Sequence, residues 1–557
     1  IERIVNHPVN VLTALSVLPN PRLPLPPELY APERRNSRGW DLTDPETLSE
    51  LQAGMARAAD LVFMAAPLVG GAEISTGPII PVVNPADIRK QIGSVREASD
   101  EDVNHAVNLA VDACRAWDRL GGDRRASILE RAADLYETAA PELMMLAIRE
   151  AGKTIPDAVA ELREAVDFLR YYAAQARAKF TSPIVLPGVT GETNLLELHG
   201  RGVFACISPW NFPLAIFTGQ VAAALAAGNA VVAKPAEQTP LIAARAVRLL
   251  HDAGVPADVL GFVPGDGRVG EVLVNQPGIA GVAFTGSTEV ARLIARALAA
   301  KDGPIATLVA ETGGINAMIV DSSALPEQVV GDVITSAFGS AGQRCSALRM
   351  LFLQDDIAAK VRDMLAGAMT ELSVGDPANL ATDVGPVIDA FARDVLETHA
   401  AALVRDGNLL AQSPLPAECR FGTFSPPRAF VLDRPQRLER EVFGPCLHVV
   451  RYGADRLHDV LEWIRGSGYG LTLGIHSRID SFQQRIREST AIGNIYVNRS
   501  MIGAVVGSQP FGGEGLSGTG PKAGGPHSLY RFACERSVAI NTSAAGGNAA
   551  LLAEMEE

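Results

Sequence analysis

A lone cysteine stands in a segment that could expose a reactive sulfur. Cys345 has small neighbours that would leave the sulfur accessible, and Arg344 beside it is a cation of the kind that lowers a thiol pKa and favours the thiolate. The usual alternative for a lone cysteine is a buried structural residue. Cys345 is therefore a candidate nucleophile with a structural alternative.

A carboxylate and an amide stand in two further loops. Glu311 opens the Glu-Thr-Gly-Gly motif at residues 311–314, directly after a predicted strand, and a carboxylate in a glycine-rich turn can reach into a cleft. A simple turn or helix cap is the alternative. Asn211 lies between two prolines that stiffen its loop, and its amide can donate two hydrogen bonds. For Asn211 the alternative is a buried turn in which the amide bonds the backbone.

A second acidic residue points to a nucleotide. Glu237 ends the motif Lys-Pro-Ala-Glu at residues 234–237, after the second predicted strand. A carboxylate there can bind ribose hydroxyls and repels a 2′-phosphate, so Glu237 favours NAD over NADP. The alternative is a surface Lys–Glu pair, which would contribute little.

Two glycine-containing turns could approach a phosphate. Residues 265–270 contain G-x-G-x-x-G, but this pattern follows the third predicted strand, whereas the dinucleotide fingerprint belongs to the first strand–helix turn. We interpret it as a tight turn near a cofactor. Residues 284–287 open a helix whose free N–H groups can receive a pyrophosphate. Neither the Cys345 segment nor residues 515–520 fits the G-x-S-x-G elbow of a serine hydrolase.

These residues follow the strands of an alternating pattern. Short apolar strands are predicted near residues 202–207, 230–233, 259–263, 281–284 and 307–310, with helices near residues 218–227, 241–253, 269–275 and 289–299. This alternation predicts a parallel sheet covered on both faces, with ligands at the carboxyl ends of its strands. A second α/β region is expected from residue 315 to about 506.

The flanking segments are predicted from periodicity and turn residues. Residues 19–32 hold six prolines, which favour an extended connector. A helical pattern runs from about residue 45 to 66, and another over residues 100–180. Residues 183–200 suggest a hairpin. The start at Ile1 rather than Met is consistent with a piece processed or excised from a longer protein.

Length and composition exclude several classes of protein. A chain of 557 residues, 47% hydrophobic and 20% charged, is neither disordered nor fibrous and predicts two to four domains. The net charge of −14, without a basic block, argues against nucleic acid and anionic membranes. Six scattered cysteines, with no zinc-site spacing, predict reduced thiols and no metal. No signal peptide or membrane-length apolar run is found, so we expect a cytoplasmic location.

Taken in order, seven segments resemble the aldehyde dehydrogenase superfamily. The resemblance spans roughly residues 75–545 and is carried by the motifs at residues 209–213, 234–237, 284–287, 311–314, 342–345, 441–445 and 510–513. It sharpens toward the C-terminal half of the bacterial proline utilization A family, through residues 29–30 and 34–37, the proline-rich connector, and residues 344–346, 513–520 and 523–526. In that bifunctional family, a flavin-dependent proline dehydrogenase precedes an L-glutamate-γ-semialdehyde dehydrogenase.

The resemblance implies a catalytic set. Cys345 would be the nucleophile, and its backbone N–H and the Asn211 side chain would form the oxyanion hole. Glu311 would activate the water that hydrolyses the thioester. Lys234 and Glu441 would bind ribose hydroxyls, with Glu237 near the adenosine ribose.

The resemblance also implies cofactor and substrate contacts. The pyrophosphate would meet Gly286 and Ser287, and Phe443 would pack near the nicotinamide ribose. The other implied NAD contacts are Ile207, Ser208, Pro209, Trp210, Ala236, Gly267, Gly270, Phe284, Thr285, Thr312 and Gly313. The implied substrate contacts are Glu164, Phe168, Arg344, Ser346, Gly513 and Glu514.

The resemblance further implies an α/β fold with a Rossmann-type NAD-binding domain, an α/β catalytic domain and a small β extension. We expect a connector and arm at 1–75, an NAD-binding domain at 76–182 and 203–313, and a catalytic domain at 314–510. The extension, at 183–202 and 525–545, would mediate a homodimer. A proline dehydrogenase module would lie upstream in a longer chain.

Three alternatives remain beside the oxidation of L-glutamate γ-semialdehyde by NAD. The enzyme could act on another semialdehyde, such as succinate semialdehyde. It could be a catalytically dead structural protein on the same scaffold, which the intact Cys345, Glu311 and Asn211 make improbable. An acylating, CoA-dependent dehydrogenase typically lacks the base that Glu311 provides.

Overall fold

A seven-stranded sheet carries most of the predicted ligand-binding turns. The computed structural model describes residues 6–15, 20 and 22–542, and the strand order of this sheet is β12-β11-β8-β9-β10-β2-β3. Its strands are β8 (Val203–Ile207), β9 (Ala230–Lys234), β10 (Leu260–Phe262), β11 (Ile279–Gly286), β12 (Thr307–Thr312), β2 (Leu68–Val69) and β3 (Ala72–Glu73). The five strands from β12 to β10 pair in parallel, which confirms the predicted parallel sheet.

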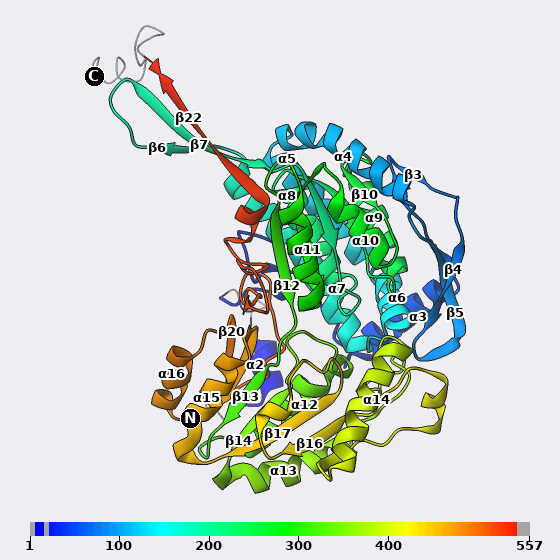
Figure 1. Cartoon of the computed structure of the whole chain (residues 1–557), viewed down its shortest axis with the longest axis vertical. Helices are drawn as coiled ribbons and strands as arrows, with labels where there is room; N and C mark the ends of the chain where they lie inside the picture. The colour runs from blue at the N-terminus through cyan, green and yellow to red at the C-terminus, as the bar shows by residue number, and fades with distance from the viewer. Residues whose placement is uncertain (1–5, 16–19, 21, 543–557) are drawn as a thin grey trace.

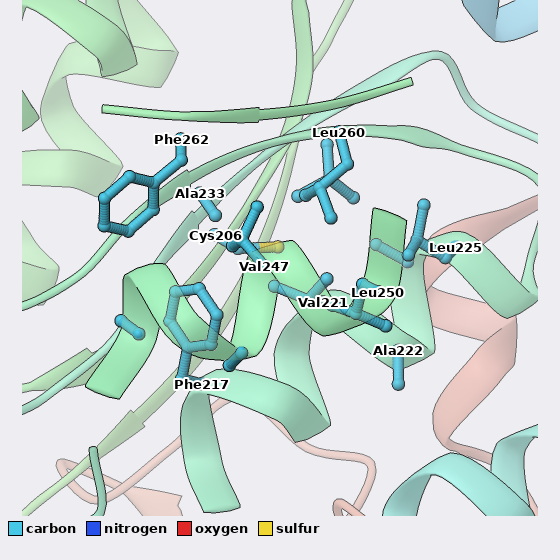
Figure 2. Packing of buried hydrophobic residues seen from close by; sticks show 14 of the residues in the cluster. Cys206, Phe217, Val221, Ala222, Leu225, Ala233, Val247, Leu250, Leu260 and Phe262 are labelled. Atoms are coloured by element: carbon cyan, nitrogen blue, oxygen red, sulfur yellow. The ribbon is translucent and has the colours of Figure 1, made fainter. Parts of the chain in front are cut away.

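Helices cover this sheet because the sequence alternates apolar strands with amphipathic or apolar helices. They are α4 (Asp100–Arg119), α5 (Gly122–Thr138), α6 (Ala140–Ala151), α7 (Ile155–Phe180), α8 (Ala215–Ala226), α9 (Pro240–Asp252), α10 (Gly267–Asn275) and α11 (Thr288–Ala300). Figure 2 shows Leu260 and Phe262 of β10 near Val221 of α8 and Val247 of α9, all of them buried. Each such side chain stabilises the fold by about 1.5–3 kcal/mol when it leaves water.

The second predicted α/β region forms another seven-stranded sheet, in the order β15-β16-β17-β14-β13-β19-β20. Its strands are β13 (Ala317–Val320), β14 (Met350–Gln354), β15 (Leu409–Gln412), β16 (Arg428–Leu432), β17 (Cys446–Tyr452), β19 (Thr472–His476) and β20 (Asn494–Val497). Its helices are α12 (Pro326–Phe338), α13 (Asp355–Thr370), α14 (Ala390–Arg405), α15 (Leu457–Gly466) and α16 (Asp480–Ser489). This sheet occupies the lower half of Figure 1 and has its own hydrophobic core.

The helix predicted from about residue 45 to 66 is shorter than expected. Helix α3 ends at Ala59, and Phe63–Ala65 forms strand β1, which pairs in parallel with strand β5 (Asp87–Arg96). Strand β4 (Ile79–Asn84) completes this three-stranded sheet. The prediction failed because a partner strand about thirty residues later decides the conformation of residues 63–65, and local periodicity does not report it.

A three-stranded sheet projects from the body of the protein (Figure 1). Strands β6 (Ile184–Leu186) and β7 (Glu192–Gly200) form the predicted hairpin. Strand β22 (Ala533–Asn541) pairs with β7 along its whole length, so the two segments expected in the β extension share one sheet. The division into domains stays a prediction, and residues 543–545 of the expected extension lie outside the described residues.

The remaining elements are short or lie in the N-terminal arm. They are α2 (Pro8–Ala14), α3 (Pro45–Ala59), β18 (Tyr469–Gly470), β21 (Glu514–Gly515) and the 3₁₀ helices η1 (Pro26–Glu28), η2 (Gly339–Gly342), η3 (Ala417–Phe421), η4 (Pro435–Arg437), η5 (Ala454–Arg456) and η6 (Ser528–Phe532). Within the described part of the chain, we find no helix long and apolar enough to cross a membrane.

Candidate active site

The structure brings Cys345 and Glu311 to one cavity. Cys345 lies in the loop between η2 and β14, and Glu311 is the last residue but one of β12, so the strand runs slightly further than its predicted end. Both side chains line a cavity of about 360 Å³, to which helix α7 and the segment Ile502–Val506 also contribute. A candidate nucleophile and a carboxylate thus line the same cavity.

Arg349 stabilises the Cys345 loop through hydrogen bonds to backbone carbonyls. Its guanidinium is fully buried and donates to the carbonyls of Gly342 (2.7 Å), Gly444 (3.1 Å) and Arg344 (3.1 Å). On the other side of the loop, Asn316 Nδ2 donates to the Cys345 carbonyl at 2.6 Å. These bonds fix the backbone on both sides of the sulfur. Sequence reasoning missed both residues.

The expected activation of Cys345 by Arg344 is wrong for this structure. Arg344 Nη2 lies 2.6 Å from Asp157 Oδ1, so its charge is already paired. Burial of the sulfur raises the pKa of the Cys345 thiol to about 12, and the negative charges of Glu441 and Glu311 contribute less to this rise. Arg349 is the cation that opposes this rise. The resting cysteine is therefore a thiol.

Asn211 stands beside the nucleophile loop. It follows β8 and is buried, and its Nδ2 donates to the Gln343 carbonyl at 3.1 Å. One N–H of the amide is used by this bond, so the second remains for an oxyanion. The structure thus bears out the interpretation in which the amide bonds the backbone, and the role of Asn211 toward an oxyanion stays a prediction.

Glu311 is held by a single backbone donor. Its Oε2 accepts from the Gly513 N–H at 3.0 Å. Burial raises the pKa of the Glu311 carboxyl to about 8, against the opposing effects of that hydrogen bond and of Lys522. A carboxyl that titrates near neutral pH is suited to a general base.

Four of the six predicted substrate contacts line the cavity, namely Glu164, Phe168, Arg344 and Ser346. Burial, together with the charge of Glu161, raises the pKa of Glu164 to about 7. Lys153, which the sequence did not single out, also lines the cavity and lies 3.7 Å from Glu161. The cavity therefore offers both signs of charge near the nucleophile.

The two other predicted substrate contacts lie elsewhere. Within the described residues, neither Gly513 nor Glu514 lines the cavity. The Gly513 N–H is engaged by Glu311, and Glu514 is exposed on β21, where it pairs with Gly470. The proposed use of this loop backbone as a substrate anchor is not supported, because its donor already has a partner.

A segment of the N-terminal arm reaches the cavity wall. Arg34 forms an ion pair with Asp167 of α7 at 2.7 Å and donates to the Val506 carbonyl at 2.7 Å. Asp167 and Val506 both line the cavity. The Ser37 hydroxyl also donates to Asp167, at 2.7 Å. The sequence suggested only a connector here, and no local pattern indicates these contacts.

Two of the three predicted ribose contacts, Lys234 and Glu237, lie at or just after the end of β9. Lys234 is buried, and its Nζ donates to the Pro235 carbonyl at 2.8 Å, which leaves other N–H groups for a ligand. Burial lowers the pKa of Lys234, while Glu237 and Asp266 oppose that change. Ala236 is buried and Glu237 is exposed, so the carboxylate can meet a ligand from solvent.

Two glycines of the third turn lie at the start of α10. This helix begins at Gly267, and its N-cap is Asp266. A side chain at Gly270 would contact the methylene groups of Lys234. The turn is thus next to the predicted ribose-binding lysine, as our interpretation of the pattern requires.

The predicted pyrophosphate turn opens a helix, as expected. Gly286 ends β11, and Ser287 is the N-cap of α11, where its side chain accepts from the Val290 N–H. Phe284 is buried, and the Thr285 hydroxyl accepts from Gln220 at 3.0 Å. The N-terminus of α11 therefore lies at the carboxyl edge of the sheet and favours an anion.

The turn at residues 311–314 meets the turn at residues 441–445. Glu441 Oε1 accepts from Arg349 at 3.1 Å, and a side chain at Gly313 would collide with the Glu441 carboxylate. Phe443 packs edge-to-face on Trp210, with ring centroids 5.5 Å apart. These residues come from both sheets, so the site lies between them.

The remaining predicted cofactor contacts lie on the same edge. The Ser208 N–H donates to the Lys234 carbonyl at 3.1 Å, and the Ile207 carbonyl accepts from Gln220 at 3.3 Å. Pro209 follows in the same loop, and the Thr312 N–H donates to the Ser517 carbonyl at 2.9 Å. These groups fit a dinucleotide, because a cation, an exposed carboxylate and a helix N-terminus lie along one edge of the sheet.

The chain belongs to the aldehyde dehydrogenase family, whose pattern it matches over residues 73–538. Among curated relatives it is similar to "Bifunctional protein PutA" of Klebsiella aerogenes, with 50% identity over 551 residues that cover 96% of this chain and 41% of the relative. It is also similar to "1-pyrroline-5-carboxylate dehydrogenase" of Geobacillus thermodenitrificans, with 37% identity over 86% of this chain and 93% of the relative. The resemblance seen in the motifs is confirmed.

Solved structures give the same result. A proline utilization A variant from Bradyrhizobium japonicum superposes with a TM-score of 0.86 and 53% identity, over 94% of this chain and 50% of that one. A 1-pyrroline-5-carboxylate dehydrogenase from Thermus with bound NAD superposes with a TM-score of 0.87 and 31% identity, over 95% of this chain and all of that one. The chain spans 41% of the length of the PutA relative from Klebsiella aerogenes.

Proposed function

We propose that this chain oxidises L-glutamate γ-semialdehyde to L-glutamate with NAD⁺, as the second step of proline breakdown. The observation that carries the proposal is the single cavity that joins Cys345, Glu311 and charged groups of both signs. An amino-acid aldehyde carries an ammonium and a carboxylate, so the cations Arg344 and Lys153 and the acid Glu164 of this cavity suit its two charged groups. The names of the relatives support this substrate.

The first chemical step uses Cys345 and Asn211. The Cys345 thiol releases its proton to solvent. The resulting thiolate attacks the aldehyde carbon, and the carbonyl oxygen becomes an alkoxide. The second N–H of Asn211 and the Cys345 backbone N–H would donate to that oxygen, and such donors contribute about 3 kcal/mol each. Bound NAD⁺ would accept the hydride, and its positive ring would favour the thiolate.

The second step uses Glu311. After oxidation the acyl group is a thioester on Cys345. Glu311 takes a proton from water, the water oxygen attacks the thioester carbon, and the C–S bond breaks to release glutamate and the Cys345 thiolate. The residues proposed to hold NAD⁺ are Lys234, Glu237, Gly286, Ser287, Glu441 and Phe443, with the neighbouring turns.

The experiment is NADH formation with a panel of aldehydes. The panel contains L-glutamate γ-semialdehyde, succinate semialdehyde and an uncharged aliphatic aldehyde, each at several concentrations. We expect the highest kcat/KM for L-glutamate γ-semialdehyde. A higher kcat/KM for succinate semialdehyde would contradict the substrate assignment, although the reaction type would stand.

We propose a homodimer formed through the β extension. Ile184, Val185 and Ile540 are 54%, 73% and 47% exposed on its strands, which is unusual for apolar strand residues. Light scattering should give twice the chain mass, and Val185→Glu should lower it. Unchanged mass in Val185→Glu would exclude this surface.

Oxidation of proline is one chemical source of this aldehyde. We propose that a proline dehydrogenase module supplies it, because the first PutA relatives are bifunctional and longer than this chain. We also propose a cytoplasmic location, as expected from the sequence.

A further inference from the structure

One peptide unit connects Lys522 to Glu311. The Gly512 carbonyl accepts from Lys522 Nζ at 2.6 Å, and the Gly513 N–H of the same peptide donates to Glu311 Oε2 at 3.0 Å. The ammonium and the carboxylate thus bind opposite ends of one peptide dipole. Each bond polarises that peptide toward the other, so the two strengthen together.

The surrounding contacts keep this peptide in place. Asn494 of β20 accepts from both the Gly512 N–H and Lys522 Nζ, each at 3.2 Å. Phe511 and Ala523 exchange two backbone hydrogen bonds, of 3.0 Å and 2.8 Å. A side chain at Gly512 would press on the Glu311 carboxylate. Lys522 therefore sits in a fixed frame rather than on a mobile surface loop.

The charges that face the pair come from three segments. Glu311 and Lys522 interact electrostatically with each other. Glu311 also interacts with the Cys345 sulfur, and Lys522 also interacts with the exposed Glu514. Burial raises the pKa of Glu311 to about 8, and Lys522 acts against that rise. Burial lowers the pKa of the half-buried Lys522 ammonium, whereas Glu311 and Glu514 raise it.

We propose that Lys522 is a positioning residue for hydrolysis of the thioester: through the Gly512–Gly513 peptide it holds the Glu311 carboxylate in place and favours its ionised form. The inference rests on the proposed role of Glu311. In the hydrolysis step, one proton moves from water to Glu311 while the C–S bond breaks. Lys522 acts before that transfer, by keeping Glu311 able to accept the proton.

The direct test is the titration of Glu311 by infrared spectroscopy. The band of its protonated carboxyl is isolated by subtracting the spectrum of Glu311→Gln, and its pH dependence is compared in the wild type and Lys522→Met. We expect the midpoint to rise by about one pH unit in Lys522→Met, since an ammonium ion favours a nearby carboxylate. Lys522→Arg should keep the midpoint near the wild-type value.

The matched control is Lys360→Met, which removes an exposed lysine on α13 that pairs with Glu327. Lys360→Met should leave the titration unchanged. If Lys522→Met does not fold, Lys522→Gln removes the same charge and is measured in its place. An unchanged midpoint in the charge-removing variant would overturn the proposal.

A kinetic measurement separates this proposal from the proposed function. The phase of NADH formation that follows the first turnover should lose about tenfold in rate at pH 7 in Lys522→Met and recover at high pH, while the first turnover is unchanged. A pH-independent loss would point to a structural role and contradict the inference. A wild type without activity would defeat the proposed function, but the infrared titration would still decide the role of Lys522.

Discussion

Arg34 Nη1 lies 2.7 Å from Asp167 Oδ1, and both residues are buried. The arm that carries Arg34 thus supports the wall of the candidate active-site cavity, because Asp167 belongs to helix α7 and lines that cavity. The same guanidinium donates to the carbonyl of Val506, which also lines the cavity. One residue of the arm therefore joins two segments that line the cavity.

Arg34→Ala should weaken both the fold and substrate binding. Breaking a buried ion pair leaves Asp167 uncompensated and costs about 3–5 kcal/mol of unfolding free energy. We expect a severalfold higher KM for the semialdehyde and little change in KM for NAD⁺. Arg35→Ala is the control, since Arg35 is exposed. Equal effects of the two substitutions in denaturant titrations and kinetics would show that the arm contact is unimportant.

Glu311→Gln should separate the two halves of the reaction. The first NADH is formed without the base, whereas thioester hydrolysis requires it. Rapid mixing should show a burst of one NADH per site followed by slow turnover. Steady turnover at the wild-type rate would rule out the base.

In the wild type, the rate of thioester hydrolysis should change with pH in a direction that the state of Glu311 determines. Glu311 must be ionised to take a proton, and burial raises its pKa to about 8. Hydrolysis should therefore accelerate between pH 7 and pH 9. A rate that is flat over this range, measured with acylation complete, would show that Glu311 titrates lower than the structure indicates.

Cys345 should react slowly with iodoacetamide in the free protein. Its environment raises the thiol pKa to about 12, so the thiolate fraction should grow about tenfold per pH unit between pH 7 and pH 9. NAD⁺ should increase the rate. Because Cys114 and Cys534 are also free and partly or fully exposed, the labelled peptide is identified by mass spectrometry. A rate of labelling that stops rising near pH 7 would contradict the conclusion that Cys345 is a thiol in the free protein.

Glu237→Ser should reduce the ratio of kcat/KM for NAD⁺ to kcat/KM for NADP⁺. Glu237 is exposed near Lys234, and its carboxylate repels a 2′-phosphate of about −2 charge. The substitution should chiefly raise kcat/KM for NADP⁺. Both cofactors are measured on both proteins. A wild type that uses NADP⁺ as well as NAD⁺, or an unchanged ratio, would show that Glu237 does not set the choice.

Much of this site could be predicted from the sequence because its parts are local. Lys234, Gly286 and Glu311 stand at strand ends, and a parallel sheet places its strand ends on one edge. The contacts that could not be predicted join distant segments. Arg344 pairs with Asp157, 187 residues away, and this removed the cation expected to activate Cys345. Arg34 and Asp167, 133 residues apart, likewise carry no local pattern.

In the proposed reaction, Cys345 forms a thioester during the oxidation of L-glutamate γ-semialdehyde. The most direct measurement is NADH formation from this aldehyde by the wild type and by Cys345→Ser at neutral pH, with NAD⁺ binding followed in parallel. A serine hydroxyl is far less acidic than a thiol, so the attacking anion is nearly absent. We predict steady NADH formation by the wild type, and no turnover but retained NAD⁺ binding by Cys345→Ser. Full activity of Cys345→Ser, or no NADH from the wild type, would contradict the account.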